Sequence, residues 1–501
     1  MVIPEYILEL LRKLEEKGFE TYIVGGCVRD FLLSKEPQDW DLTTNALPEE
    51  ILKIFSNAKY ENQFGTVLLP LRKKTDSGEK GELLDVIEIT TYRSEQGYSD
   101  NRHPDQIRFE TEIDKDLERR DFTINALALG FVKSGAILKP YRELIEIDGQ
   151  SYELVDLFRG RRDLKDKMIR AVGEPTERFK EDALRMIRAI RFSSQLGFEL
   201  EEKTKRAILK LAGAIKFISK ERVRDELIKI IKSDRPAVGI RLLHECKLLQ
   251  YIIPELEEGV EMEQNHHHLF KVFDHNVNAL KNCPSADWQV RLAALFHDIG
   301  KPKTRKFIDG AATFYNHEYV GARQVERIMK RLKFSTEDST RVVNLVRNHM
   351  FYYNVGEVTA ASVRRLIVKV GRENLKDLID LRIGDRLGSG TPKGMTYKLR
   401  HLEYMLEKVQ NDPISVKMLK INGHDLISDL GLVPGPKIGA ILDVLLSEVI
   451  ENPDLNTKEF LLQKANELQN FNLAELAERA KEKIEERREE EDNNLKKSFQ
   501  V

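Results

Sequence analysis

YIVGGCVRDFLL, residues 22–33, is the stretch that decides the fold of the N-terminal part of this 501-residue chain. Its apolar start predicts a short buried strand over residues 21–24, and Gly25 and Gly26 predict a turn into a helix that begins near Val28. A glycine turn before a helix lets backbone N–H groups approach a phosphate. Neither GxGxxG nor GxxxxGK[ST] occurs in the chain, so neither a dinucleotide-binding fold nor a P-loop is supported.

Acidic residues follow in PQDWDLTT (residues 37–44) and LLDVIEITTYR (residues 83–93). On a strand, Asp39 and Asp41 would share one face while Trp40 points to the other. Glu88 can join them from the second run, and Asp85, on the opposite face of that run, is its rival. Three convergent carboxylates suit two Mg²⁺ ions, which align a 3′-hydroxyl nucleophile and neutralise a triphosphate. We therefore predict Asp39, Asp41 and Glu88 as catalytic residues, with Asp39 and Asp41 as the Mg²⁺ ligands.

Further motifs follow in a fixed order: LERRDFTINALAL (117–129), VDLFRGRRDL (155–164), EDALRMIRAIRF (181–192) and SKERVRDELIKI (219–230). With the GGxVRD and DxD motifs, this series resembles the nucleotidyltransferase core of the DNA polymerase β superfamily. Within it, the first 240 residues are similar to class II tRNA nucleotidyltransferases (CCA-adding enzymes) and bacterial poly(A) polymerases. The resemblance implies Mg²⁺-dependent addition of CMP and AMP, from CTP and ATP, to a tRNA 3′ end with release of pyrophosphate.

The motif EDALRMIRAIRF predicts how a nucleotide is chosen, because Asp182, Arg185, Arg188 and Arg191 recur every three residues. A carboxylate accepts from the exocyclic amine of cytosine or adenine, and a guanidinium donates to the neighbouring ring nitrogen. Guanine and uracil present the reverse pattern, so the first two residues would select C and A. The other two would contact base or triphosphate. The alternative is an arginine-rich helix that faces solvent or RNA.

The resemblance adds Gly26, Arg29 and Arg120 to the predicted nucleotide-binding residues. Arg119 would help Arg120 clamp the triphosphate, and Asp121 and Asn125 would hold the ribose or fix the loop. The stretch over residues 91–109 resembles the flexible loop needed for addition of the terminal A.

The second half of the chain carries FDHNVNAL, LAALFHDIGKP and IGDRLGSG. These motifs supply His275, His297, Asp298 and Asp385, an order that resembles the HD-domain metal-dependent phosphohydrolases. Imidazole and carboxylate ligands on packed helices suit Mn²⁺, Ni²⁺, Co²⁺ or Mg²⁺ with an open water position. The complete set predicts an active site, and the resemblance implies action on 2′,3′-cyclic or 2′-phosphorylated ends.

Other residues near these motifs have less specific patterns. His317 and His349 are further candidates for ligands or phosphate contacts, and Lys301 is a candidate phosphate contact. The role of the run at residues 266–268, His266 to His268, stays open between capping, surface exposure and metal binding.

Composition limits the class of protein. Lys and Arg number 81 and Asp and Glu 83, so any nucleic-acid surface must be local. Residues 157–235 contain 22 Lys and Arg against 13 Asp and Glu, which predicts a track for a phosphate backbone. Three cysteines without a CxxC pair predict a reducing, cytoplasmic location. Neither a bilayer-spanning stretch nor a signal peptide is recognised, so no membrane association is predicted.

We expect an α+β protein with four segments: a polymerase-β-like nucleotidyltransferase palm (1–140), an all-α neck and body that reads the nucleotide and binds RNA (141–260), an all-α HD domain (261–395), and a helical tRNA-binding module with a charged tail (396–501). The patterns specify no oligomeric state. Three alternatives stay open. They are a poly(A) polymerase or an enzyme that adds only A, a nucleotide-signalling hydrolase (which places the HD domain first), and an RNA-binding protein with inactive sites.

Overall fold

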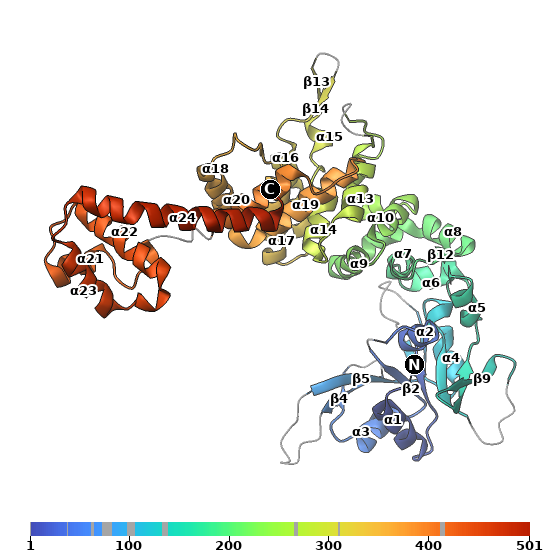
Figure 1. The fold of residues 1–501 in the computed structure, drawn as a ribbon. Coiled ribbons are helices and arrows are strands. Elements are labelled where there is room, and N and C mark those ends of the chain that lie inside the picture. Colours follow the sequence, from blue (N-terminus) through green and yellow to red (C-terminus); the bar gives the residue numbers. More distant parts are fainter. Residues whose placement is uncertain are drawn as a thin grey trace. The chain divides into compact units, whose positions relative to one another are not determined.

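The computed structural model describes residues 2–37, 39–61, 65–72, 83–97, 106–132, 139–264, 269–308, 311–410 and 416–501. The chain divides into two compact units (Figure 1). The first comprises Met1–Arg347 with Gly384–Gly390, and the second comprises Asn348–Ile383 with Thr391–Val501. The predicted α+β class is confirmed, because one N-terminal sheet is followed by a largely helical remainder.

The sheet of the first unit has eight strands in the order β3-β4-β5-β2-β1-β8-β10-β9. Its central strands are β1 (Thr21–Val24), β2 (Asp41–Thr44), β5 (Leu83–Thr91) and β8 (Ala128–Phe131). The outer strands are β3 (Lys59–Tyr60), β4 (Thr66–Arg72), β9 (Arg142–Ile147) and β10 (Gln150–Val155). Helix α1 (Glu5–Glu15) buries Ile7, Leu11 and Leu14, as its helical spacing predicts. Helix α3 (Pro48–Ile54) and the short hairpin β6 (Arg93–Gln96) and β7 (Gln106–Phe109) complete this part.

The sheet differs from its predicted extent in two places. Strand β2 begins at Asp41, so Asp39 lies before the strand and not on its face. At the other end the sheet continues past residue 140, because β9 and β10 pair with each other and β10 pairs with β8. The edge strand β9 has the sequence RELIEI, in which charged residues dilute the apolar alternation that marks a strand.

Helices make up most of the rest of the first unit. They are α2 (Gly26–Leu32), α4 (Ile113–Glu118), η1 (Thr123–Asn125), α5 (Gly160–Lys165), α6 (Pro175–Glu181), α7 (Leu184–Leu196), α8 (Glu202–Leu211), η2 (Ala212–Phe217), α9 (Lys220–Lys232), α10 (Pro236–Glu245), α11 (Leu249–Ile252), α12 (Pro254–Glu257), α13 (Val272–Asn282), α14 (Trp288–Phe296), α15 (Lys301–Thr304), α16 (His317–Arg331) and α17 (Thr336–Asn348). Two-residue strands β11 (Met168–Ile169) and β12 (Glu199–Leu200) pair in parallel. The hairpin of β13 (Lys306–Ile308) and β14 (Ala311–Thr313) was not predicted.

The motif at residues 181–192 forms two helices and not one. Helix α6 ends at Glu181, Asp182 is extended with φ −142° and ψ 105°, and α7 begins at Leu184. The Asp182 carboxylate accepts a hydrogen bond from the Leu184 backbone N–H at 3.0 Å. Such local bonding from an Asp side chain competes with continuous helix, and here it ends one helix and starts the next.

The second unit is helical, as predicted. It contains α18 (Ala360–Val370), η3 (Arg372–Asn374), most of α19 (Leu375–Gly388), α20 (Tyr397–Gln410), η4 (Val416–Met418), α21 (Gly423–Leu430), α22 (Pro436–Glu451), η5 (Pro453–Leu455), α23 (Lys458–Leu468) and α24 (Leu473–Phe499). Leu426, Ile441, Leu445, Leu461 and Leu476 share one buried apolar cluster. Across the described part of the chain, every helix falls short of the length and apolarity that crossing a membrane requires.

Candidate functional site

A cavity of about 730 Å³ lies at the end of β1, between the sheet and α7. Gly25, Gly26, Arg29, Asp39, Asp41, Arg120, Asp121, Asn125, Arg188, Arg191 and Phe192 are among its lining residues. Gly25 has a φ of 87°, and a Cβ atom there would lie 3.0 Å from the Arg120 guanidinium. The close approach therefore depends on Gly25, whereas Gly26 is an ordinary first residue of α2.

Of the predicted carboxylates, Asp39 and Asp41 line this cavity, and Glu88 lies beside Asp41 but is absent from the lining. Asp41 lies directly opposite Glu88 in the parallel pair of β2 and β5. Burial raises the pKa of the Asp41 carboxyl, Arg120 opposes that rise, and Asp39 adds to it. Burial and the charge of Asp41 likewise raise the pKa of Glu88. Asp85, the rival of Glu88, accepts a hydrogen bond from Tyr6 at 3.5 Å.

Crowded carboxylates with raised pKa values favour a bound cation, which removes their repulsion. Oxygen ligands in this number are the ligands that Mg²⁺ prefers. Asp39, Asp41 and Glu88 therefore fit a Mg²⁺ site by the chemistry of their donor atoms.

Cationic side chains also line the cavity, and a chain of contacts holds two of them, Arg29 and Arg188. Arg29 donates to Asn125 at 2.8 Å, Asn125 donates to Asp121 at 3.1 Å, and Arg188 lies 2.6 Å from Asp121. Burial favours the neutral form of Asp121, but Arg188 and Asn125 outweigh it and hold the pKa of Asp121 at about 2. Asp121 and Asn125 thus hold the guanidinium groups in place, which agrees with the predicted role of fixing the loop.

Arg120 depends on a residue that sequence reasoning missed. Its guanidinium lies 3.1 Å from Asp116, which is completely buried and also pairs with Arg119 at 2.7 Å. Burial alone would favour the neutral acid, but the two guanidinium groups lower the pKa of Asp116. Arg119 points to Asp116 and Glu95 and is absent from the lining of the cavity.

Arg191 is the most enclosed of the predicted arginines. It is 7% exposed, pairs with Glu226 at 3.2 Å, and lies 4.1 Å from the centre of the Phe192 ring. Burial and the neighbouring charge of Arg188 lower its pKa to about 10. The positive charge of Arg191 is therefore largely compensated within the protein by Glu226.

Asp182 and Arg185 lie outside the lining of this cavity. Both Asp182 oxygens are held by Arg222 of α9, at 3.3 and 2.6 Å. Arg185 donates to Glu181 at 2.7 Å and to the Arg119 carbonyl at 3.1 Å. Arg222 lies in the motif SKERVRDELIKI, which indicates the family but predicts no role for this arginine. The helix break separates Asp182 from the three arginines, which all lie on α7.

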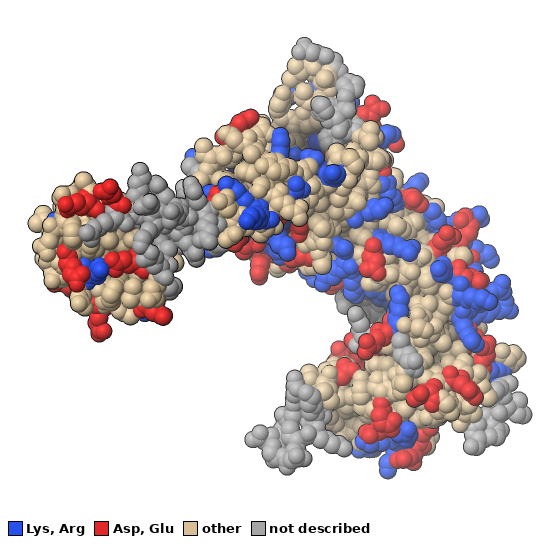
Figure 2. Space-filling view, viewed as in Figure 1, with Lys and Arg blue, Asp and Glu red and all other residues tan. Residues whose placement is uncertain are grey.

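The basic stretch at residues 157–235 is partly internal, since several of its arginines pair with buried acids. Figure 2 shows Lys and Arg gathered over the helical part of the first unit, around α5 and α8. An open hollow of about 670 Å³ is lined there by Arg159, Arg161, Arg162 and Lys165. The Arg161 and Arg162 side chains are 53% and 71% exposed and pair with Glu143 and Asp166, which are also largely exposed, so the positive charge that faces water is concentrated at α5.

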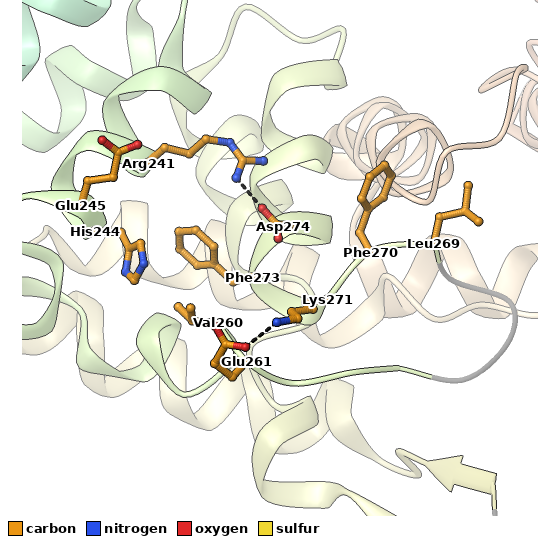
Figure 3. A pocket seen from close by; sticks show the side chains of 10 residues that line it. All are labelled: Arg241, His244, Glu245, Val260, Glu261, Leu269, Phe270, Lys271, Phe273 and Asp274. Atoms are coloured by element: carbon orange, nitrogen blue, oxygen red, sulfur yellow. Dashed lines mark hydrogen bonds and ion pairs between the residues drawn. The ribbon is translucent and has the colours of Figure 1, made fainter.

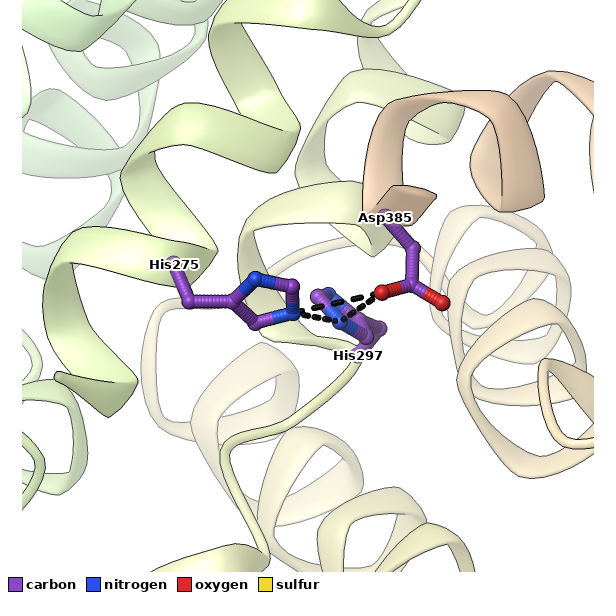
Figure 4. A group of neighbouring side chains, drawn as sticks. All are labelled: His275, His297 and Asp385. Carbon is purple, nitrogen blue, oxygen red and sulfur yellow. Dashed lines mark hydrogen bonds and ion pairs between the residues drawn. The ribbon is translucent and has the colours of Figure 1, made fainter. Parts of the chain in front are cut away.

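The four predicted HD-type residues meet in the helical part of the first unit (Figure 4 draws three of them). The Nε2 atoms of His275 and His297 are 2.9 Å apart. The His275 Nε2 atom lies 3.1 Å from Asp298 and 3.3 Å from Asp385, and the same His297 atom lies 3.3 and 3.5 Å from them. All four side chains are at most 10% exposed.

The tautomer of His297 suits metal binding. Its Nδ1 atom is 2.8 Å from the Ala294 carbonyl and donates to it, so Nε2 is the ring nitrogen that faces the centre. Burial favours neutral imidazole, but the Asp298 and Asp385 carboxylates raise the pKa of His297 to about 10. A centre that attracts a cation so strongly fits a divalent ion.

Two neighbours contact the Asp298 carboxylate from outside this set. Lys301 lies 2.6 Å from Oδ2, and the His317 Nε2 atom lies 3.1 Å from Oδ1. Lys301 also donates to Gln264 at 2.5 Å. His349 belongs to the second unit and is not assigned to this centre. The run at residues 266–268 lies outside the described residues, as does part of the loop at residues 91–109.

A further cavity of about 380 Å³ lies between α10 and α13. Figure 3 shows it with two ion pairs, Arg241–Asp274 and Lys271–Glu261, and with the rings of His244 and Phe273. The His244 ring also contacts Glu257 at 2.8 Å. Because its charged groups already pair with one another, this cavity shows no preference for a ligand of either charge.

Three family models match the chain. The model for the Poly A polymerase head domain covers residues 21–170. A model described as "Probable RNA and SrmB- binding site of polymerase A" covers residues 197–259, and a model for tRNA nucleotidyltransferase domain 2 covers residues 311–465.

Curated relatives are similar along almost the whole chain. The CCA-adding enzyme of Ligilactobacillus salivarius is 31% identical over 92% of this chain and 96% of its own length. The CCA-adding enzyme of Limosilactobacillus reuteri is 33% identical over 92% and 95%. Among solved structures, the Bacillus stearothermophilus CCA-adding enzyme in complex with CTP is 24% identical, covers 93% of this chain and 97% of that chain, and has a TM-score of 0.56. This last likeness shows the shared fold.

Proposed function

Because the chain belongs to the family of CCA-adding enzymes, we propose that it adds CMP and AMP from CTP and ATP to the 3′ end of tRNA and releases pyrophosphate. The observation that carries the proposal is one cavity that joins Asp39 and Asp41 to Arg29, Arg120 and Arg188. Acids on one side suit metal ions, and guanidinium groups on the other suit a triphosphate. Solved relatives with the same fold are complexes with CTP and with ATP.

Asp39, Asp41 and Glu88 would hold Mg²⁺, which supplies alignment of the attacking 3′-hydroxyl and neutralises charge on the triphosphate. Gly25 lets the backbone approach the phosphates at the start of α2. Arg29 and Arg188 are held by Asn125 and Asp121, so their charges are in place before a nucleotide arrives. Such preorganised charge lowers the cost of binding and of charge transfer.

The base would be read by Asp182 and Arg185. Among the described contacts, Asp182 Oδ1 accepts from Leu184 and Arg222, and Oδ2 accepts only from Arg222. One lone pair of Oδ2 is therefore left for an exocyclic amine. Arg222 would hold the carboxylate in one plane for this contact. In the same way Arg185, which makes three described hydrogen bonds, keeps two of its five donors for the base.

The four predicted segments receive roles on the same basis. We assign the transfer reaction to residues 1–140 and reading of the base and RNA contact to 141–260. The model matches at 21–170 and 197–259 support the order of these roles, and the first match together with strands β9 and β10 favours an end of the head later than residue 140. The helical module over 396–501 would hold tRNA. Three free, buried cysteines are in keeping with a cytoplasmic location.

The deciding experiment supplies all four nucleoside triphosphates to three tRNAs, which lack CCA, CA or A at the 3′ end, and sequences the product ends. We expect CCA, CA and A to be added, and the reaction to stop there. A long A tail would instead assign a poly(A) polymerase. Addition of A alone to the tRNA that ends in CC would assign an A-adding enzyme.

A second candidate function is favoured by the buried centre of His275, His297, Asp298 and Asp385. Two imidazoles and two carboxylates suit Mn²⁺, Ni²⁺, Co²⁺ or Mg²⁺, and such an ion supplies an activated water. We propose a phosphohydrolase site in residues 261–395 that acts on 2′,3′-cyclic or 2′-phosphate esters. The test is hydrolysis of 2′,3′-cyclic AMP with each metal, and no hydrolysis with any of them would assign a structural role.

A further inference from the structure

The hairpin of β13 and β14 is flanked on both sides by residues that contact the buried HD-type centre. Its first strand follows α15, where Lys301 lies 2.6 Å from the Asp298 carboxylate. Its second strand leads to α16, where His317 lies 3.1 Å from the same carboxylate. A Cβ atom on Gly300 would lie 2.1 Å from the His317 carbonyl oxygen, so the two roots of the hairpin are packed together at a glycine. The segments before and after the hairpin therefore contact the same carboxylate, that of Asp298, through Lys301 and His317.

Beyond these roots the hairpin leaves the body of the first unit (Figure 1). Phe307 is 65% exposed, Ile308 is 48% exposed, and Tyr315 at the base is 72% exposed. A two-stranded hairpin is marginally stable by itself, and these exposed side chains bury little apolar surface that could stabilise it. Large apolar side chains gathered in water next to a candidate active site indicate a binding surface.

The charges around these rings identify the kind of partner. The Arg305 guanidinium lies 4.7 Å from the centre of the Phe307 ring, and Arg347 lies 5.5 Å from that of Tyr319. Within residues 301–319 there are four Lys and Arg against two Asp and Glu, with four Phe and Tyr. The buried Nε atom of Arg305 has no hydrogen-bond partner among the residues that the structure describes.

Exposed aromatic rings with cations beside them match a single-stranded nucleic acid, whose bases stack on rings while its phosphates pair with cations. A double helix keeps its bases stacked inside and offers no face to such rings. The surface is also continuous with a centre suited to phosphate esters, which a strand end carries.

We propose that the β13–β14 hairpin is a binding arm for single-stranded RNA that directs a strand end to the HD-type centre. Bases stack on Phe307 and Tyr315, and backbone phosphates pair with Arg305 and Lys306. This inference rests on the phosphohydrolase function proposed for that centre. In that reaction water adds across one P–O ester bond of a 2′,3′-cyclic phosphate, which gives a phosphomonoester and a free hydroxyl.

The test compares two substrates of the full chain with Mn²⁺ present: an RNA hexamer with a 2′,3′-cyclic phosphate end, and 2′,3′-cyclic AMP. The double variant Phe307→Ala/Tyr315→Ala should lower the ratio of kcat/KM for the hexamer to that for the mononucleotide roughly tenfold to a hundredfold. Val368→Ala removes an 85% exposed apolar side chain from the second unit and should leave the ratio unchanged. An unchanged ratio in the double variant overturns the proposal, and so does an equal loss on both substrates, which would mean that the hairpin only supports the centre.

A binding measurement separates this proposal from the proposed hydrolysis. A hexamer with 4-thiouridine next to its 3′ end is crosslinked to the protein, and the modified peptide is mapped. We expect crosslinks within residues 305–316 that the double variant loses, whether or not the parent hydrolyses either substrate. Crosslinks elsewhere, or equal capture by the variant, would assign the exposed rings to a protein contact and overturn the RNA-binding arm.

Discussion

Asp41 is the residue on which we expect transfer at the first site to depend most directly. It stands at the first position of β2, opposite Glu88, and Arg120 is the cation nearest to it. Asp41→Asn keeps the shape and removes the charge. A metal-held triphosphate then loses several kcal/mol of charge stabilisation, which corresponds to roughly a thousandfold lower kcat. Incorporation of labelled CMP into tRNA measures this, and tRNA affinity should stay within a few fold.

The matched control is Asp85→Asn, on the neighbouring strand. Asp85 lies three residues before Glu88 and accepts from Tyr6, so its loss should leave CMP incorporation near the level of the parent. Near-normal turnover by Asp41→Asn would remove the assignment of Asp41 as a metal ligand.

Selection of the nucleotide is proposed to depend on Asp182 and Arg185. Incoming C and A satisfy both side chains, whereas U and G leave a polar group unpaired, at about 1–3 kcal/mol for each such group. Asp182→Ala and Arg185→Ala should each lower kcat/KM for CTP and ATP together and reduce the preference over UTP and GTP by roughly tenfold or more. Arg222→Ala frees the Asp182 carboxylate and should weaken the same preference.

The comparison uses kcat/KM for all four triphosphates on matched tRNA ends. Arg12→Ala, which removes a 44% exposed arginine paired with Glu5 on α1, serves as the control and should leave selectivity unchanged. A slow but equally selective Arg185→Ala enzyme would show that this segment positions phosphate or RNA. Recovery of selectivity by Arg222→Lys would show that a positive charge at this position is sufficient.

The Asp121 carboxylate, which pairs with Arg188 of α7, makes the stability of the first unit sensitive to acid. Its pKa of about 2 lies below the ordinary 3.8, so the carboxylate stabilises the fold above pH 4 and loses this effect as pH falls toward 2. The full shift corresponds to about 2 kcal/mol, and about 1 kcal/mol of it is lost between pH 5 and pH 3.

Asp121→Asn removes this link and leaves Arg188 without its charged partner, so the variant should be less stable at every pH. Its free energy of unfolding should also fall about 1 kcal/mol less than that of the parent between pH 5 and pH 3. Urea unfolding followed by circular dichroism at both pH values measures the difference. The same acid-induced loss in parent and variant would mean that Asp121 is not the group responsible.

At the scale of single elements, the sequence predicted those features that depend on local pattern. The strand before Gly25 and the helical repeat of α1 follow from periodicity and from short-range chemistry. The sequence also predicted that Glu88 could join Asp41 from a second strand-like run, and the two residues are opposite each other in the parallel pair of β2 and β5.

Elements whose form depends on distant partners were not predicted. The spacing in residues 181–192 fits one helix, and only the contact of Asp182 with Arg222 and with the Leu184 N–H makes the break favourable. Arg191 and Arg188 looked free in sequence, but Glu226 and Asp121 come from other segments and pair with them. The β13–β14 hairpin is too short, with three residues in each strand, to interrupt the surrounding helical pattern.

The basic surplus of residues 157–235 illustrates the same limit. A count of charges predicts a surface for phosphates, but it does not separate arginines that pair with buried acids from those at α5 that face water. Only the arrangement in space makes that separation, because the paired acids lie 35 or more residues away from these arginines along the chain.

At the scale of the whole molecule, the two candidate sites consist of different residues and lie in different parts of the first unit. The first lies between the sheet and α7, and the second lies among α13, α14 and the last turns of α19. Gly384 and Gly388 allow α19 to pack closely on α13, where a Cβ atom at either would lie 2.8 Å from the Ala279 backbone. The HD-type centre is therefore assembled by helix packing that the transfer site does not share.

Chemical independence of the two sites follows from this separation. His297→Ala removes one imidazole from the centre and should abolish metal-stimulated hydrolysis of 2′,3′-cyclic AMP, while CCA addition stays within about twofold of the parent. Because His297 is 1% exposed, the substitution also leaves a cavity, so Asp298→Asn, which keeps the volume, is measured beside it. His424→Ala, at an exposed histidine of the second unit, is the matched control and should change neither activity. If Asp298→Asn, with an unchanged unfolding midpoint, loses CCA addition together with hydrolysis, the two sites are coupled, and the HD-type centre then contributes to the transfer reaction itself.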